Sequence, residues 1–146
     1  MAAEENKRLI RMLIEEGLNK GKLDWAAEHF TPDYLVHIPG RTDLPTGPES
    51  FKQVIGMWRA AFPDWHMTIE QLIAEGDLVA NRFTTRGTHQ APLFGIPPTG
   101  KKMTVNGMEV HRIKDGKVAE TWVCDDVPGI LMQLGITPPP PIGRPR

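Results

Sequence analysis

Cysteine is nearly absent from the sequence, clusters of one charge are missing, and no long apolar run occurs. The single Cys124 excludes an intrachain disulfide and a multi-cysteine metal site, which suits a reducing compartment. The 17 basic and 18 acidic residues nearly cancel, so charge gives no support for a nucleic-acid partner. No apolar stretch approaches the ~18 residues of a membrane span, and the opening MAAEENKRL carries charge where a secretory signal would be apolar. We therefore expect a cytoplasmic protein with a small-molecule ligand, and neither a nucleic acid nor a membrane as partner.

The 5 histidines are too scattered to indicate a metal site. None of them forms an H-x-H or H-E-x-x-H pair, the short spacings that place two imidazoles on one metal ion. We therefore predict that the protein binds no metal.

The first third of the chain has the apolar spacing of helices. Leu9, Leu13 and Leu18 recur along one face of an amphipathic helix, which Gly21 ends. Two more helices are predicted, one over residues 24–30 that Thr31-Pro32 ends, and one over residues 48–62.

The rest of the chain has the patterns of strands. Strands are predicted over residues 34–38, 66–75, 78–90, 102–114 and 117–126, with turns at Gly76-Asp77 and Asp115-Gly116. Helices followed by a run of hairpin-linked strands predict an α+β fold with an antiparallel sheet, and a pocket between the two layers. A short helix over residues 127–134 closes the fold. We expect one domain, residues 1–137, and a proline-rich tail, residues 138–146.

Alternation along the last strand separates two adjacent aspartates. Trp122, Cys124 and Asp126 share one face of that strand, while Asp125 lies on the other. A face with both a large aromatic and an acid is typical of a pocket wall. Alternation does not say which face is the inside, so either set could belong to the core, and Asp126 also suits the N-cap of the closing helix.

Three segments carry a family resemblance. They are G-T-H at Gly87 to His89, F-G-I-P-P-T-G at Phe94 to Gly100, and E-x-W-x-x-x-D at Glu120, Trp122 and Asp126. With these segments, residues 62–135 closely resemble the SnoaL-like polyketide cyclases of the nuclear-transport-factor-2-like superfamily. The resemblance implies a cone-shaped, curved antiparallel or mixed sheet on three N-terminal helices, a deep apolar pocket, a homodimer, and catalysis without metal or organic cofactor.

The same resemblance implies which residues form the site. An aspartate at the end of the last strand is the general acid/base for an intramolecular aldol closure in these cyclases, and it corresponds to Asp126. Glu109 and His111 are expected to assist, and His37 is a second candidate for proton transfer. The expected substrate-binding residues are Trp122, Cys124, His89, Trp58, Phe62 and Phe94.

Two other activities of the superfamily fit less well. Ketosteroid isomerases use an acid before the proline of the first strand, where this chain has Ile38, and limonene epoxide hydrolases need Arg-x-Asp where it has Arg82-Phe83-Thr84. We therefore predict a cofactor-independent lyase or isomerase that acts on a hydrophobic, carbonyl-bearing small molecule. The alternatives are a non-catalytic binding domain of the same fold, or a hydrolase or dehydratase that uses the same aspartate.

Overall fold

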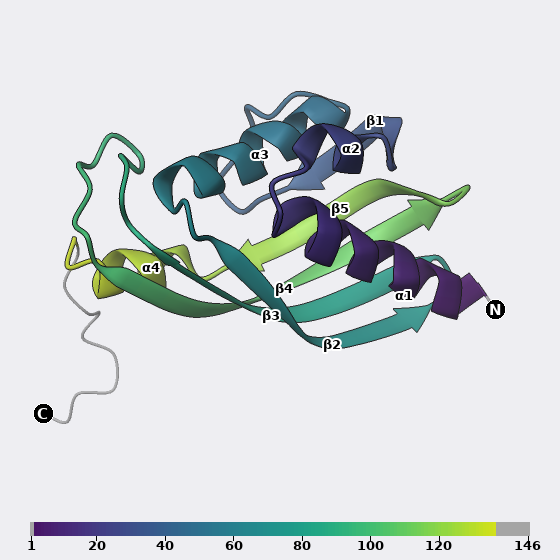
Figure 1. The fold of residues 1–146 in the computed structure, drawn as a ribbon. Helices are drawn as coiled ribbons and strands as arrows, with labels where there is room; N and C mark the ends of the chain where they lie inside the picture. The colour runs from purple at the N-terminus through teal and green to yellow at the C-terminus, as the bar shows by residue number, and fades with distance from the viewer. Residues whose placement is uncertain (1, 137–146) are drawn as a thin grey trace, which may run out of the picture.

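A layer of helices covers one face of a curved sheet in the computed structural model, which describes residues 2–136 (Figure 1). The helices are α1 (Ala2–Met12), its π-helical continuation η1 (Leu13–Leu18), α2 (Leu23–Ala27), α3 (Pro48–Ala61) and α4 (Val127–Gln133). The strands are β1 (Phe30–His37), β2 (His66–Glu75), β3 (Leu78–Thr88), β4 (Lys102–Lys114) and β5 (Lys117–Asp125). The predicted α+β class is confirmed.

The sheet is open and mixed, with strand order β1-β5-β4-β3-β2. The β2–β3, β3–β4 and β4–β5 pairs are antiparallel, as expected of strands joined by hairpins. β1 pairs with β5 in parallel. A parallel partner fits here because β1 precedes the hairpin strands and joins the edge of the sheet after a long crossover through α3 and β2–β4.

The second predicted helix ends earlier than its sequence pattern suggests. The predicted helix reaches residue 30, but α2 ends at Ala27 and β1 begins at Phe30. Thr31 and Pro32 therefore belong to the strand. Proline cannot donate a ladder hydrogen bond, so it is tolerated only where a strand has a free edge, and β1 is an edge strand. Gly47 supports the start of α3 with a φ of 99° and a close approach to the Pro32 carbonyl, where a Cβ would lie 2.9 Å away.

A β-bulge interrupts the β4–β5 hairpin. Ile113 pairs with Val118, but Arg112 pairs with Glu120, so Ala119 is an extra residue in β5. Because side chains alternate, one extra residue reverses the facing of every later residue of the strand. Val118 and Ala119 are both buried, and beyond them Thr121, Val123 and Asp125 face the helices.

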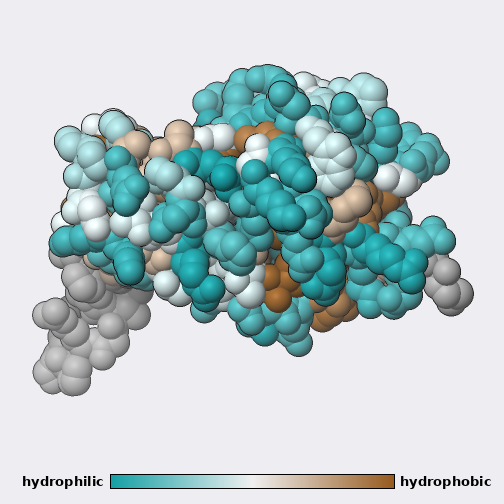
Figure 2. Space-filling view, in the orientation of Figure 1, coloured by the Kyte–Doolittle hydropathy of each residue, from teal (hydrophilic) through white to brown (hydrophobic). Residues whose placement is uncertain are grey.

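The core fills the space between the sheet and the helices. Side chains from all parts of the chain meet there, including Ile10, Phe30, Phe51, Phe83 and Ile130. The view in Figure 2 is mostly hydrophilic, with hydrophobic residues at its surface only in patches. Within residues 2–136, no helix is long and apolar enough to cross a membrane. The predicted tail lies outside the described residues.

Candidate active site

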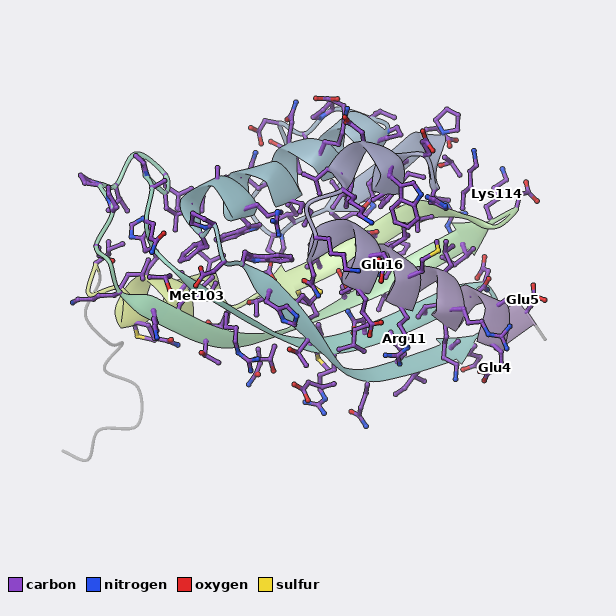
Figure 3. All side chains as sticks on the ribbon, in the orientation of Figure 1. Glu4, Glu5, Arg11, Glu16, Met103 and Lys114 are labelled. Atoms are coloured by element: carbon purple, nitrogen blue, oxygen red, sulfur yellow. The ribbon has the colours of Figure 1, made fainter. Side chains whose placement is uncertain are left out.

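A largely apolar cavity lies between the helices and the inner face of the sheet. It offers about 80 Å³ of space to the centres of water-sized molecules. Its polar lining comes mainly from β1, β4 and β5: Tyr34, Glu109, His111, Thr121 and Asp125, with Trp65 and Thr85 from elsewhere. In Figure 3, Met103 and Lys114 mark the two ends of β4, the strand that carries Glu109 and His111.

Glu109 and His111 form a buried pair, in which Asn81 contacts the glutamate and Thr121 contacts the histidine. The Nε2 atom of His111 lies 3.2 Å from the Glu109 carboxylate, and its Nδ1 atom lies 2.8 Å from the Thr121 hydroxyl. The Asn81 amide donates to the same Glu109 oxygen at 2.8 Å. Both ring nitrogens of His111 are therefore engaged with protein groups.

The pKa values of the two acids in the cavity are shifted in opposite directions. Burial opposes ionisation of Glu109, but His111 and Asn81 together hold the pKa of this carboxyl below its ordinary value. Burial raises the pKa of Asp125 to about 6, and the nearby negative charge of Glu109 adds to the rise. Asp125 receives no hydrogen bond from any group within residues 2–136. It is thus an unpaired acid whose pKa lies close to neutral pH.

Asp125 stands where the inner cavity meets a second recess at the surface. Both hollows include Asp125, Val54 and Trp58. Around the outer recess lie Ile38, Pro39, Arg41, Met57, Phe94, Val127 and Pro128. This recess forms a mouth through which a ligand can reach Asp125. Phe94 stands half-exposed at the mouth, edge-on to Trp58 with ring centroids 6.0 Å apart.

The prediction that Asp126 faces the pocket is wrong. The Asp126 side chain accepts a hydrogen bond from the Gly129 amide at 2.9 Å and caps α4. It lies in a shallow hollow on the outer side of the sheet, together with Cys124 and Met108. The bulge at Ala119 is the physical reason, because it turns Asp125 inward in place of Asp126.

Three more predicted residues lie outside the pocket, and two of them, Trp122 and Cys124, follow the bulge on β5. Trp122 and Cys124 are exposed and do not line the cavity. His37 is also exposed, where it contacts Glu120 at 2.6 Å and stacks on Trp122 with ring centroids 5.3 Å apart. The structure therefore does not bring His37, Trp122 or Cys124 to the pocket.

His89 and Phe62 are packing residues rather than pocket residues. Both are fully buried, with ring centroids 5.6 Å apart, and neither lines the cavity. The Nδ1 atom of His89 accepts a hydrogen bond from the Thr99 amide and so fixes the base of the loop between β3 and β4. Of the ten predicted residues, the structure places Glu109, His111 and Trp58 in the cavity and Phe94 at its mouth.

Sequence reasoning missed Asp125, Tyr34, Thr121 and Asn81. The register of β4 with β5, which the bulge sets and the sequence does not show, explains the misses on β5, since Glu109 faces Val123 and His111 faces Thr121 across the two strands. Directly paired residues lie on one face, so inward Glu109 and His111 require inward Thr121 and Asp125. Nothing in the sequence marked Asn81, which faces Glu109 across β3 and β4. Within residues 2–136, no group of three or more His, Cys, Asp or Glu side chains is arranged to hold a metal ion.

Comparisons with known proteins identify the family of this chain. The profile of the SnoaL-like polyketide cyclases matches residues 8–134. Nogalonic acid methyl ester cyclase of Streptomyces nogalater is 34% identical over 118 residues, which cover 80% of this chain and 88% of that protein. An aklanonic acid methyl ester cyclase of Streptomyces peucetius is 30% identical over 141 residues, 92% of this chain and 94% of that one.

A solved structure extends the likeness to three dimensions. The crystal structure of IdmH from Streptomyces antibioticus has a TM-score of 0.77 and 34% identity, and the match covers 89% of this chain and 98% of that chain. The profile match, the relatives and the shared nuclear-transport-factor-2-like fold agree over most of the described residues. The protein therefore belongs to the SnoaL-like polyketide cyclase family.

Proposed function

We propose that the protein closes a ring in a polycyclic, ketone-bearing polyketide methyl ester by an intramolecular aldol reaction, without a cofactor. The observation that carries the proposal is Asp125, an unpaired acid with a pKa of about 6 in an apolar cavity. Support comes from the relatives in Streptomyces, which are named as cyclases of nogalonic and aklanonic acid methyl esters.

Asp125 has the properties of a general base for carbon acids. Its ionised form is poorly solvated, which makes the carboxylate a stronger base, and a pKa of about 6 keeps it ionised at neutral pH. A proton leaves the carbon next to the ester carbonyl and binds to the carboxylate. The carbanion electron pair then forms the new carbon–carbon bond to the ketone carbon. The ketone π pair moves to oxygen, which takes the proton back from Asp125.

The adjacent aspartates provide a matched test of this role. Asp125→Asn keeps the shape of the side chain but removes the base, so we expect kcat for aklanonic acid methyl ester to fall by about 10²–10⁴-fold. Asp126→Asn should change kcat less than about twofold, because asparagine caps helices as well as aspartate does. Turnover by Asp125→Asn at the rate of the unmodified protein would refute the proposal. Conversion is followed by chromatography of substrate and product.

The pH profile gives a second test. Only ionised Asp125 can accept the proton, so kcat/KM should rise with pH through a midpoint of about 6 and then level off. A profile that falls as pH rises through this range would assign Asp125 the role of an acid in the free enzyme instead.

We also propose that the protein is a cytoplasmic homodimer of the lyase or isomerase class. The outer face of β4 and β5 supports a contact between copies, because Met108 is 61% and Trp122 is 40% exposed there. The exposed free thiol of Cys124 suits a reducing compartment. Sedimentation of the protein and of Met108→Lys tests the dimer, since a charge on this face should shift the equilibrium to monomers.

A further inference from the structure

Tyr34 is a buried hydroxyl in the cavity that has no part in the reaction proposed above. It is 3% exposed, lines the cavity from β1, and packs edge-on against Phe30 with ring centroids 4.7 Å apart. Burial raises the pKa of Tyr34, and the charge of Glu109 adds to the rise, so the phenol stays protonated. A protonated phenol that faces an apolar cavity is a hydrogen-bond donor for a ligand.

The buried charged pair sets the direction in which Tyr34 donates. The Tyr34 side chain lies close enough to Thr121 for the two to interact, and the Thr121 hydroxyl lies 2.8 Å from Nδ1 of His111. When the Glu109–His111 pair is charged, the imidazolium donates from both nitrogens, and the Thr121 oxygen accepts one of these bonds. Thr121 then has its own hydrogen available to donate to the Tyr34 oxygen. Within residues 2–136, no group then accepts a hydrogen bond from Tyr34, so its hydrogen can be donated into the cavity.

Tyr34 and Asp125 lie at different depths of the same cavity. Thr121, the partner of Tyr34, precedes Asp125 by four residues on β5, which separates their backbones by about 13 Å at the usual rise of a strand. Asp125 adjoins the mouth, while Tyr34 belongs to the inner cavity alone. A planar ligand of three or four fused rings is long enough to extend from one group to the other.

We propose that Tyr34 anchors the inner end of the substrate by donating a hydrogen bond to a ring carbonyl oxygen, while Thr121, His111 and Glu109 orient its hydroxyl. This deepens the proposed function and rests on it for the polycyclic ketone as substrate. The anchor fixes how far the ring system enters and so holds the reacting side chain near Asp125. Thr85 and Trp65 also line the cavity, but within residues 2–136 neither is joined to the charged pair.

Two matched tricyclic probes test the anchor without turnover. 9-Fluorenone carries a ring carbonyl, and fluorene has a methylene group in its place. Binding is measured by quenching of the fluorescence of Trp58 and Trp65, which line the cavity. Tyr34→Phe should weaken 9-fluorenone binding about tenfold and leave fluorene binding within about twofold, the size of one lost hydrogen bond. Equal effects on both probes, or none on either, would overturn the proposal.

A spectroscopic signal separates a lost hydrogen bond from a change in packing. The carbonyl stretching band of bound 9-fluorenone should lie at lower frequency in the unmodified protein than in Tyr34→Phe, because donation to the oxygen weakens the C=O bond. An identical band in both proteins would refute the anchor. Thermal unfolding of Tyr34→Phe verifies that the variant is folded.

Kinetics distinguish a failure of the anchor from a failure of Asp125 as base. For aklanonic acid methyl ester, Tyr34→Phe should raise KM about tenfold with little change in kcat, whereas Asp125→Asn should lower kcat. If Asp125→Asn turns over normally while Tyr34→Phe still loses affinity for 9-fluorenone alone, the base is refuted and the anchor stands. If Tyr34→Phe leaves KM and 9-fluorenone binding unchanged while Asp125→Asn is inactive, the anchor is refuted and the base stands.

Discussion

A glutamate is paired with a histidine on each face of the β4–β5 hairpin, and the two pairs differ in their exposure to water. Inside, Glu109 and His111 are buried and held by Asn81 and Thr121. Outside, Glu120 pairs with His37, whose side chain is 45% exposed, and with Arg112. Water screens the outer pair, so its charges interact weakly with the rest of the protein.

The difference indicates where this fold can do chemistry. Burial and then the negative charge of Glu109 raise the pKa of Asp125, because both acids face a cavity with few polar groups. On the outer face, hydrogen bonding by His37 is the main reason that the pKa of Glu120 is low. The same residue types therefore form a reactive site on one face and a solvated ion pair on the other.

The largest expected effect comes from breaking the inner pair. Glu109→Gln removes the charge that compensates buried His111, so we expect a loss of about 3–5 kcal/mol in the free energy of unfolding. Glu120→Gln on the outer pair should cost less than about 1 kcal/mol. Urea denaturation of both variants at pH 7 measures the difference. Equal losses would show that burial does not distinguish the two pairs.

The pH dependence of stability should separate Asp125 from the other acids. Its pKa is about 6 in the folded protein and near the ordinary value of 3.8 when unfolded, so the folded state binds more protons between these values. Asp125 therefore lowers the free energy of unfolding as pH rises from about 4 to 6, by no more than about 3 kcal/mol. Asp125→Asn should abolish this contribution. Denaturation midpoints of both proteins from pH 4 to 8 provide the measurement, and parallel curves would contradict the raised pKa.

The inner face should also resist any added volume beside Asp125. Gly107 pairs with Asp125, and a Cβ on it would lie 2.5 Å from the Phe83 ring, which is buried. Gly107→Ala should therefore destabilise the protein by about 1–3 kcal/mol, because the ring must move. Its thermal midpoint, compared with that of the exposed Gly116→Ala, tests this packing. Gly116 has a positive φ, so any loss there reports backbone strain and not crowding.

The smallest effect is expected on the outer face. Cys124→Ser should change the free energy of unfolding by no more than about 0.5 kcal/mol and leave kcat and KM unchanged, because the thiol is exposed and lies outside the cavity. Loss of turnover in this variant would mean that the outer hollow takes part in the reaction.

The fold was predictable because its signals are local. The turns at Gly76-Asp77 and Asp115-Gly116 give the two hairpins, and the bounds of β2 and β4 agree with the predicted ranges 66–75 and 102–114. The parallel pairing of β1 with β5 joins residues about 85 positions apart, and no local pattern reports such a contact. The family resemblance supplied only the expectation of an antiparallel or mixed sheet and did not identify this pairing.

The candidate site was predictable only in part, because facing depends on register. Glu109 and His111 lie in the cavity as expected, although their catalytic roles stay predictions. Asp125 and Asp126 have the same chemistry and adjacent positions, so only the bulge decides between them. Ala119 is small and carries no turn signature, and a bulge at such a residue leaves no trace in the sequence pattern.

The bulge at Ala119 also determines how the facing of β5 should be compared between relatives. Side chains alternate along a strand, and an extra residue without a partner interrupts the alternation but does not change which residues pair beyond it. Deletion of Ala119 would leave Val118 and Glu120 opposite their present partners, Ile113 and Arg112, so Thr121, Val123 and Asp125 would still face inward. A strict count of alternation from Val118 would instead assign Trp122, Cys124 and Asp126 to the pocket, so positions in relatives should be compared by their partners in β4.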